Sequence, residues 1–137
     1  MCLDEDLIKL INEFKIKYPK HIVTVLHHIE DEDVQVYFNA ADIVVLPFKK
    51  NTTSGSALLA LSFGKPIIAP LIGSINDLPS NTGLFYSYPS INNLYEKLEI
   101  ALSEKDLRKR GINGLNFVQK ISWYDIANKT YQIFKRL

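Results

Sequence analysis

Along the chain, stretches with apolar residues at helical spacing alternate with short, continuous apolar runs. This alternation predicts the order of helices and strands. Residues 4–18 carry apolar side chains at helical spacing, with acids first and lysines last, so we predict a helix that Pro19 stops. The β-branched run at 21–29 predicts a strand. The acids of 30–33 then start a second helix, because carboxylates are stabilised at helix N-termini. The continuous apolar run at 41–47 is typical of a strand covered on both faces by helices.

The second half of the chain continues this alternation. Gly64 favours the end of a helix and Ser90 favours the start of one. The predicted elements are, in order, a polar loop at 48–56, a helix at 57–63, a strand at 65–70, turns at 73–81, a strand at 84–88, and helices that begin at Ser90, at about Glu104 and at Ser122. Strands and helices that alternate at these lengths form βαβ units with right-handed crossovers. The predicted fold class is therefore α/β, with an open parallel, Rossmann-like sheet flanked by helices.

Composition and charge exclude several classes of protein. The 137 residues contain 47% apolar and 23% charged side chains, a balance that supports one folded domain rather than a disordered chain. A net charge of +1 predicts no nucleic-acid partner. Cys2 is the single cysteine, which excludes an internal disulfide framework and fits a reducing compartment. No apolar run is long enough to span a membrane and no secretory signal is visible, so we expect a cytoplasmic protein.

The loop that follows the strand at 41–47 is the strongest candidate for a binding site. Ligands of open α/β sheets bind beyond the carboxyl ends of the strands, and a helix N-terminus favours a phosphate. Five residues at the start of the next helix can present hydrogen-bond donors: Thr52, Thr53, Ser54, Gly55 and Ser56. Serine and threonine are also ordinary helix caps, so these residues alone leave open an anion site and a simple cap. The glycine pattern matches neither the dinucleotide fingerprint nor the P-loop.

Four blocks of sequence resemble, in order and spacing, the donor-binding half of GT-B glycosyltransferases of the glycosyltransferase group 1 type, the retaining family four. They are ADIVVLPF at 41–48, TSGSALLALSFGKPIIAP at 53–70, GSINDLP at 73–79 and TGLFY at 82–86. The resemblance extends from about Pro19 to the end of the chain. It implies that the turn at 52–55 holds the diphosphate of a nucleotide sugar, which coincides with the anion site suggested by the residues.

The helix of this site departs from the family pattern at two positions. Typical members carry two glutamates eight positions apart, where this chain has Asn51 and Leu59. The resemblance implies that the Asn51 amide partly replaces the contact to the transferred sugar, whereas Leu59 cannot bind the ribose hydroxyls. A subgroup that makes bacterial surface polysaccharides is similar in sequence to 53–64, so the departure does not by itself indicate a dead enzyme.

Family domains ordinarily begin with further strand–helix units, which bring a glycine-rich turn and a basic pair to the diphosphate. The blocks quoted above include neither these units nor the acceptor-binding N-terminal domain, and we expect both to be missing from residues 1–137. We therefore expect residues 1–137 to form a single nucleotide-sugar-binding domain, the C-terminal half of a GT-B fold with its first strands partly missing. Such a fragment of a two-domain glycosyltransferase is expected to be inactive by itself.

Other residues have both a functional and a plainer interpretation. The resemblance places Asp77 near the sugar or phosphate, and His28 and Ile29 at the nucleobase, although a loop acid and a solvated strand-end histidine are the plainer roles. Lys49 and Lys50 could offset phosphate charge or simply be solvated. No metal is expected, because the helix dipole and nearby cations can neutralise a diphosphate. The catalytic residue is left unassigned.

The last helix carries an apolar stripe that includes Trp123, and its spacing predicts packing residues. In two-domain relatives this helix reaches the other domain. We therefore expect part of the stripe to be uncovered here and to favour self-association.

The predicted function is the donor-binding domain of a retaining hexosyltransferase that takes a UDP- or GDP-sugar and needs no cofactor. The resemblance implies synthesis of a bacterial surface polysaccharide or glycolipid. The expected partners are the sugar donor, the absent acceptor domain and, for the full-length protein, the membrane surface. The alternative is a degenerate, non-catalytic nucleotide-binding or interaction module that has lost both glutamates.

Overall fold

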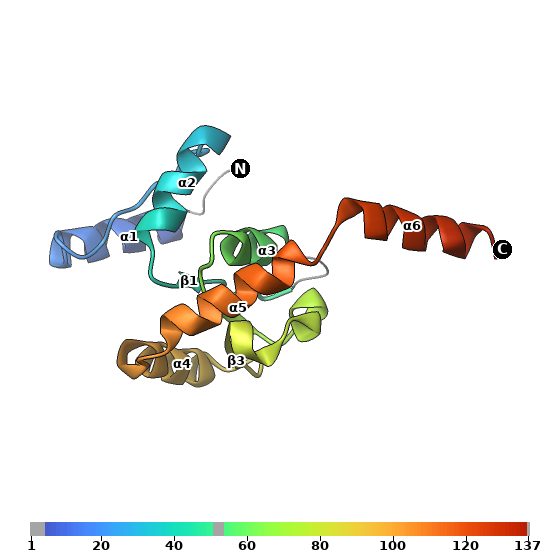
Figure 1. Ribbon diagram of the computed structural model, residues 1–137. Coiled ribbons are helices and arrows are strands. Elements are labelled where there is room, and N and C mark those ends of the chain that lie inside the picture. The colour runs from blue at the N-terminus through green and yellow to red at the C-terminus, as the bar shows by residue number, and fades with distance from the viewer. Residues whose placement is uncertain (1–4, 51–53, 137) are drawn as a thin grey trace. The chain divides into compact units, whose positions relative to one another are not determined.

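The computed structural model describes residues 5–50 and 54–136, and the chain divides into two compact units, residues 1–34 and 35–137. The elements are labelled in Figure 1 where there is room. They are, in chain order, α1 (Glu5–Lys17), α2 (Asp31–Ala40), β1 (Val44–Val45), α3 (Gly55–Ser62), β2 (Ile67–Pro70), the 3-10 helices η1 (Gly73–Asp77) and η2 (Ser80–Thr82), β3 (Gly83–Tyr86), α4 (Ile91–Ser103), α5 (Leu107–Gln119) and α6 (Trp123–Phe134). In the described part of the chain, no helix combines the length and the apolar character needed to cross a membrane.

The first unit holds α1, an irregular segment and the first turn of α2. α1 carries Glu5 and Asp6 in its first turn and lysines in its last, the charge order that the helix macrodipole favours, and it confirms the predicted helix. The predicted strand at 21–29 is wrong, because these residues form no strand and Val23 is 90% exposed. Strand propensity reflects packing on a pleated, half-buried surface, and no strand among the described residues pairs with this segment to provide one.

The second unit is built on a three-stranded parallel sheet in the order β1-β2-β3, which confirms the predicted open parallel sheet. Val44 pairs with Ile67, and Ile67 pairs with Gly83. β1 is shorter than the strand predicted at 41–47 and lies at an edge of this sheet, where Val45 is 37% exposed. All four residues of β2 are buried. The burial expected on both faces therefore holds for the central strand and not for β1.

The hydrophobic core has one half on each face of the sheet. On one face, Ile67 and Ala69 of β2 pack with the buried side of α3 and with Ile75 of η1. On the other face, Ile68 packs with Leu84 of β3 and with apolar residues of α4. Alternate β2 side chains thus point to opposite faces, as the twofold period of a strand requires. Figure 1 shows α3 and α4 flanking the strands.

The connection from β2 to β3 contains η1 and η2, which confirms the turns predicted at 73–81. Gly73 has a φ of +52°, a backbone conformation that favours glycine. Ile75 is fully buried in the same cluster as Ala57 and Ala60 of α3. The connection therefore crosses the sheet on the α3 side.

Serine caps set the starts of two C-terminal helices. Ser90 and Ser122 each accept a hydrogen bond from the backbone N–H three residues later, at 3.3 Å and 3.0 Å, which confirms the predicted starts of α4 and α6. α5 begins at Leu107 rather than at about Glu104. The reason is that Glu104 ends α4, with its N–H donating to the carbonyl oxygen of Ile100 at 2.9 Å.

The final helix, α6, has no buried residue. Trp123 is 85% exposed, and Tyr131 and Phe134 are also exposed. The predicted packing role of this stripe is therefore wrong within the described residues, because none of them covers the stripe. The expectation that part of the stripe is uncovered is confirmed.

Candidate functional site

The residues predicted to bind the donor fall into three groups. His28 and Ile29 lie in the irregular segment of the first unit, so they do not end a strand as predicted, and His28 is exposed. A second group lies outside the described residues: Asn51, Thr52 and Thr53. The third group lies in the second unit and comprises Ser54, Gly55, Ser56 and Asp77.

Ser54 is the N-cap of α3. Its Oγ accepts a hydrogen bond from the backbone N–H of Ala57 at 3.1 Å, and the residue is only 8% exposed. The simple cap that the sequence left open is therefore present. A serine hydroxyl that accepts one hydrogen bond still has its own proton to donate, so the cap does not exclude a contact between Ser54 and an anion.

Gly55 and Ser56 form the first turn of α3, where backbone N–H groups have no acceptor within the helix. Both residues are exposed, and a Cβ added at Gly55 would meet no described atom within 4 Å. The positive end of the helix macrodipole lies at the same place. This turn therefore offers backbone donors that a ligand can approach.

A cleft of about 460 Å³ joins this turn to η1. It brings Ser54 and Gly55 together with Asp77, three residues that the sequence predicted to share a site. The residues that line the cleft are Ser54, Gly55, Ala57, Leu58, Ser74, Ile75, Asp77, Leu78, Phe117 and Ile121. Ser56, at the same helix start, is not among them.

The cleft offers two kinds of polar chemistry on apolar walls. The α3 turn supplies N–H donors and the dipole that favours an anion. Asp77, which is exposed, supplies a carboxylate that accepts hydrogen bonds from hydroxyl groups. Leu58 and Phe117 line the same cleft with apolar side chains. This combination suits a ligand with an anionic part and a hydroxyl-bearing part.

Several lining residues were not found from the sequence. Ser74 lies in the block GSINDLP, where a polar residue between Gly73 and Asp77 was an available signal. Phe117 and Ile121 come from the end of α5 and the residues after it, about 60 positions from the α3 turn along the sequence. Their apolar spacing indicates a helix face, and the sequence does not say which cleft that face borders.

A larger cleft, of about 910 Å³, lies at the opposite end of the strands. It is lined by Ala41 to Ile43, which precede β1, and by Gly64 to Pro66, which precede β2. Ligand sites of open α/β sheets lie beyond the carboxyl ends of the strands rather than at their amino ends. The smaller cleft beside α3 is therefore the better candidate despite its size.

The charged groups near the candidate site are few. Lys49 and Lys50 follow the carboxyl end of β1 and are exposed. Leu59, at the position of the second family glutamate, is 41% exposed and does not line the cleft. Within residues 5–50 and 54–136, no three His, Cys, Asp or Glu residues gather in an arrangement that could hold a metal ion.

Comparison with known proteins extends these observations. The family model described as "Glycosyl transferases group 1" matches residues 4–104, which include the α3 turn and η1. An uncharacterized glycosyltransferase of Methanocaldococcus jannaschii is 22% identical over 120 residues, covering 85% of this chain and 31% of that protein.

Two solved structures have the same fold. Sucrose-phosphate synthase from Thermosynechococcus elongatus matches with a TM-score of 0.77 and 26% identity, over 98% of this chain and 35% of its own. The catalytic domain of starch synthase IV from Arabidopsis thaliana, bound to ADP and acarbose, matches with a TM-score of 0.73 and 17% identity, over 97% of this chain and 30% of its own. The chain thus spans about a third of the length of these relatives.

Proposed function

Because the chain belongs to the group 1 glycosyltransferases and has an α/β fold of the GT-B type, we propose that it binds the nucleotide-diphosphate sugar donor of such an enzyme. The observation that carries this proposal is the cleft that joins the α3 turn to Asp77. A donor of this class has the two parts that the cleft suits, a diphosphate and a sugar rich in hydroxyl groups. The starch synthase IV domain, which has the same fold, holds a nucleoside diphosphate.

In this proposal the diphosphate lies at the first turn of α3. The backbone N–H groups of Gly55 and Ser56 and the hydroxyl proton of Ser54 donate to its oxygens. Thr52 and Thr53 belong to the same turn in the sequence and add their hydroxyl groups. Lys49 and Lys50 contribute positive charge near the diphosphate.

The remaining predicted residues contact the sugar and the base of the donor. Asp77 accepts hydrogen bonds from sugar hydroxyl groups at the η1 side of the cleft. Asn51 offers its amide to the same sugar, and His28 and Ile29 contact the nucleobase. Each of these roles follows from the family resemblance of the sequence.

The proposed reaction is transfer of a hexosyl group with retention of configuration. The bond between the anomeric carbon and the β-phosphate oxygen breaks, a bond forms between that carbon and an acceptor hydroxyl oxygen, and the hydroxyl proton is released. Negative charge therefore develops on the departing nucleoside diphosphate. Donors fixed at a helix N-terminus stabilise such charge without reorganisation, which is the contribution assigned to α3.

The chain's share of its relatives supports a role as one part of a longer, two-domain enzyme. We place acceptor binding in the other domain, and expect the isolated chain to bind donor without transferring sugar. Synthesis of a bacterial surface polysaccharide or glycolipid, on the cytoplasmic side of a membrane, is the proposed setting. The exposed stripe of α6 supports contact with that domain or, in its absence, self-association.

Titration calorimetry tests the proposed binding. The 137-residue chain is titrated with UDP, GDP and ADP, and with uridine as the matched probe without phosphates. We expect one of the diphosphates to bind at least roughly tenfold more tightly than uridine, because the charge-assisted hydrogen bonds are absent from the nucleoside. Equal affinity for UDP, GDP, ADP and uridine, or no binding at millimolar concentration, would contradict the proposal.

A second candidate function is a non-catalytic nucleotide-binding or interaction module. It is favoured by the apolar Leu59, which offers no carboxylate at a position where relatives have one. An activity assay on the longer protein that contains both domains distinguishes the two functions. That protein is incubated with a sugar donor and a panel of acceptors. The first function predicts a glycosylated product, whose anomeric configuration is determined by NMR. The second function predicts no product.

A further inference from the structure

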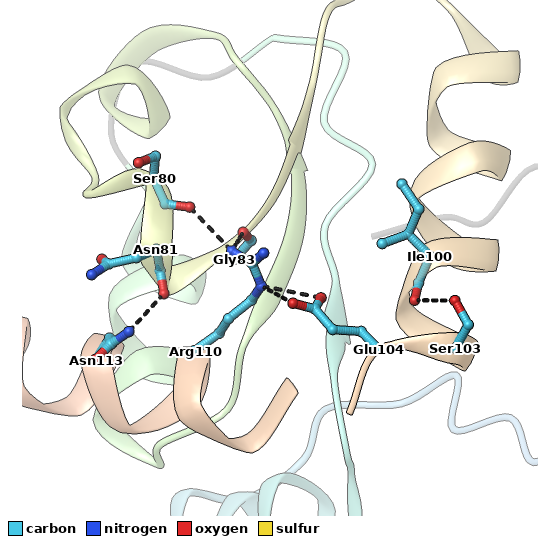
Figure 2. Close-up of polar contacts among 8 residues, drawn as sticks. All are labelled: Ser80, Asn81, Gly83, Ile100, Ser103, Glu104, Arg110 and Asn113. Carbon is cyan, nitrogen blue, oxygen red and sulfur yellow. Dashed lines mark hydrogen bonds and ion pairs between the residues drawn. The ribbon is translucent and has the colours of Figure 1, made fainter. Parts of the chain in front are cut away.

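Arg110 of α5 connects three segments of the second unit (Figure 2). Its Nε lies 2.9 Å and 3.1 Å from the two carboxylate oxygens of Glu104, at the end of α4. Its Nη1 donates to the carbonyl oxygens of Gly83 at 3.0 Å and of Ser80 at 3.3 Å. The carboxylate neutralises the guanidinium, and Nη1 reaches two backbone carbonyl groups, one in η2 and one at the start of β3.

Two further hydrogen bonds involve the segment that Arg110 holds. Thr82 is fully buried, and its hydroxyl donates to the carbonyl oxygen of Pro79 at 2.8 Å. One helical turn beyond Arg110, the amide of Asn113 donates to the carbonyl oxygen of Asn81 at 3.2 Å, as Figure 2 also shows. Ser80, Asn81 and Gly83 are therefore joined to α5 by hydrogen bonds, and the Thr82 hydroxyl bond holds the turn between them and Pro79.

α5 also packs closely against α3, which carries the other wall of the cleft. A Cβ at Gly114 would stand 2.5 Å from the side chain of Leu61, so the helices approach at a position that has no side chain. The end of the same helix lines the cleft with Phe117. α5 thus contacts α3, contacts the connection that carries η1, and forms part of the cleft between them.

We propose that Arg110 is a positioning residue that sets the place of Asp77 relative to the α3 turn. Asp77 lies three residues before Ser80, the first residue that Arg110 holds, and Ile75 is held in the core on its other side. Loss of the Arg110 contacts frees one end of η1 while the α3 turn stays in place. The donor cleft then widens or becomes mobile at its carboxylate wall. The expected loss of donor affinity rests on the proposed function, whereas the expected movement of η1 does not.

Lysine is a poor substitute for arginine in this role. A guanidinium presents several N–H donors in a fixed fork, so it can serve Glu104 and two carbonyl groups at once. An ammonium group on a flexible stem keeps the charge and loses this geometry. Arg110→Lys is therefore expected to recover part of what Arg110→Ala loses.

The test uses the 137-residue chain and four variants. Arg110→Ala and Arg110→Lys alter the proposed residue, and Asn113→Ala removes the neighbouring contact with a smaller change. Arg108→Ala, an exposed arginine on the same helix, is the matched control. Amide hydrogen exchange of Ser74 to Asp77 is measured without ligand, and UDP affinity is measured with the folded fraction established by circular dichroism.

Exchange at Ser74 to Asp77 is expected to accelerate roughly tenfold in Arg110→Ala, less in Arg110→Lys and Asn113→Ala, and not in Arg108→Ala. UDP affinity is expected to fall by a similar factor in the same order. A general loss of stability would accelerate exchange throughout the core, including Ile67 and Ile68 of β2, and would leave the affinity of the folded fraction unchanged.

The outcomes separate this inference from the proposed function. Unchanged exchange at Ser74 to Asp77 in Arg110→Ala overturns the positioning role, whether or not UDP binds. Unchanged UDP affinity in a folded Arg110→Ala also overturns it. If the unaltered chain binds GDP or ADP rather than UDP, that diphosphate replaces UDP in the affinity measurement. If it binds none of the three, the proposed function fails, and the exchange measurement still decides whether Arg110 positions η1. Should Arg110→Ala not fold, Arg110→Lys and Asn113→Ala decide by the same two measurements.

Discussion

The backbones of Gly111 and Gly64 are in direct contact. A Cβ built on Gly111 would overlap the carbonyl oxygen of Gly64, so no side chain fits at position 111. Gly64 itself has a φ of +66°, which favours glycine and ends α3 at the point where the chain turns into β2. Two glycines thus set how closely α5 approaches the helix that carries the proposed phosphate site.

Replacement of Gly111 by alanine is expected to destabilise the second unit. The added methyl group meets backbone, which cannot turn aside as a flexible side chain can, so the free energy of unfolding should fall by about 1–3 kcal/mol or more. Urea denaturation measures the change. Asn116→Ala, an exposed position on the same helix, is the control and should alter stability by no more than about 0.5 kcal/mol. Equal stability of the two variants would show that the contact is not tight.

Substitution of Ser54 separates its structural role from its proposed binding role. Ser54→Ala removes the hydrogen bond to the Ala57 N–H and should lower the free energy of unfolding by about 1 kcal/mol. Ser54→Asp keeps a capping oxygen and places a negative charge beside the proposed diphosphate. We expect it to retain more stability than Ser54→Ala and to bind UDP roughly tenfold more weakly than the unaltered chain.

Ser90→Ala is the matched control for this pair, because Ser90 caps α4 on the other face of the sheet. It should lose stability and keep its UDP affinity when the chain is folded. If Ser54→Asp binds UDP as well as the unaltered chain, the phosphate site is not at the α3 turn.

Stability is expected to fall at alkaline pH through Tyr86. Burial, with a smaller contribution from Tyr88, raises the pKa of its hydroxyl above the ordinary value of 10.0, and the residue is 6% exposed. The unfolded chain then releases this proton at a lower pH than the folded chain. The stabilisation is fully present below pH 10.0 and decreases as the pH rises through the folded-state pKa.

Urea denaturation at pH 9 and pH 11 measures this effect. Tyr86→Phe should lose less stability between the two pH values than the unaltered chain does, since phenylalanine has no proton to release. Tyr124→Phe, at an exposed position, should behave as the unaltered chain. A Tyr86→Phe variant with the same alkaline loss would assign the effect to other groups.

The exposed stripe of α6 is expected to cause weak self-association. Contiguous apolar surface on a helix favours contact with a partner, and Trp123 and Phe134 are 85% and 70% exposed. Sedimentation velocity over a range of concentrations should show a rising mean mass. The double variant Trp123→Ser, Phe134→Ser should remain monomeric over that range, while Lys129→Ser on the same helix should associate as the unaltered chain does. A monomer at every concentration would refute the proposed contact.

The sequence predicted elements best where local chemistry determines the backbone. Ser90 and Ser122 begin helices because their hydroxyl groups cap the first turn, and Gly64 ends one through its positive φ. These effects act over three or four residues and leave a clear pattern. The fully buried strand at 67–70 was equally visible as an unbroken apolar run.

The parts that depend on distant residues were not predictable in the same way. The run at 21–29 has strand composition and forms no strand, since a strand also needs a neighbour to pair with. Phe117 borders the cleft because α5 packs on α3 through glycines, which periodicity does not reveal. Nothing in the sequence pattern singles out Arg110, because the carbonyl groups that it bonds are about 30 positions away. Asp77 and Ser54 line one cleft, and the shared binding site that the family likeness of Asp77 implies stays a prediction.

The most direct test of the proposed donor site is a nuclear magnetic resonance titration of the 137-residue chain with UDP, GDP and ADP in turn. For at least one of them we expect saturable shifts of the Ser54, Gly55, Ser56 and Asp77 backbone amides, with little change at Lys65 and Arg108 in the cleft at the amino ends of the strands. Saturable shifts confined to that second cleft, or no shifts with any of the three diphosphates at millimolar concentration, would contradict the proposed site.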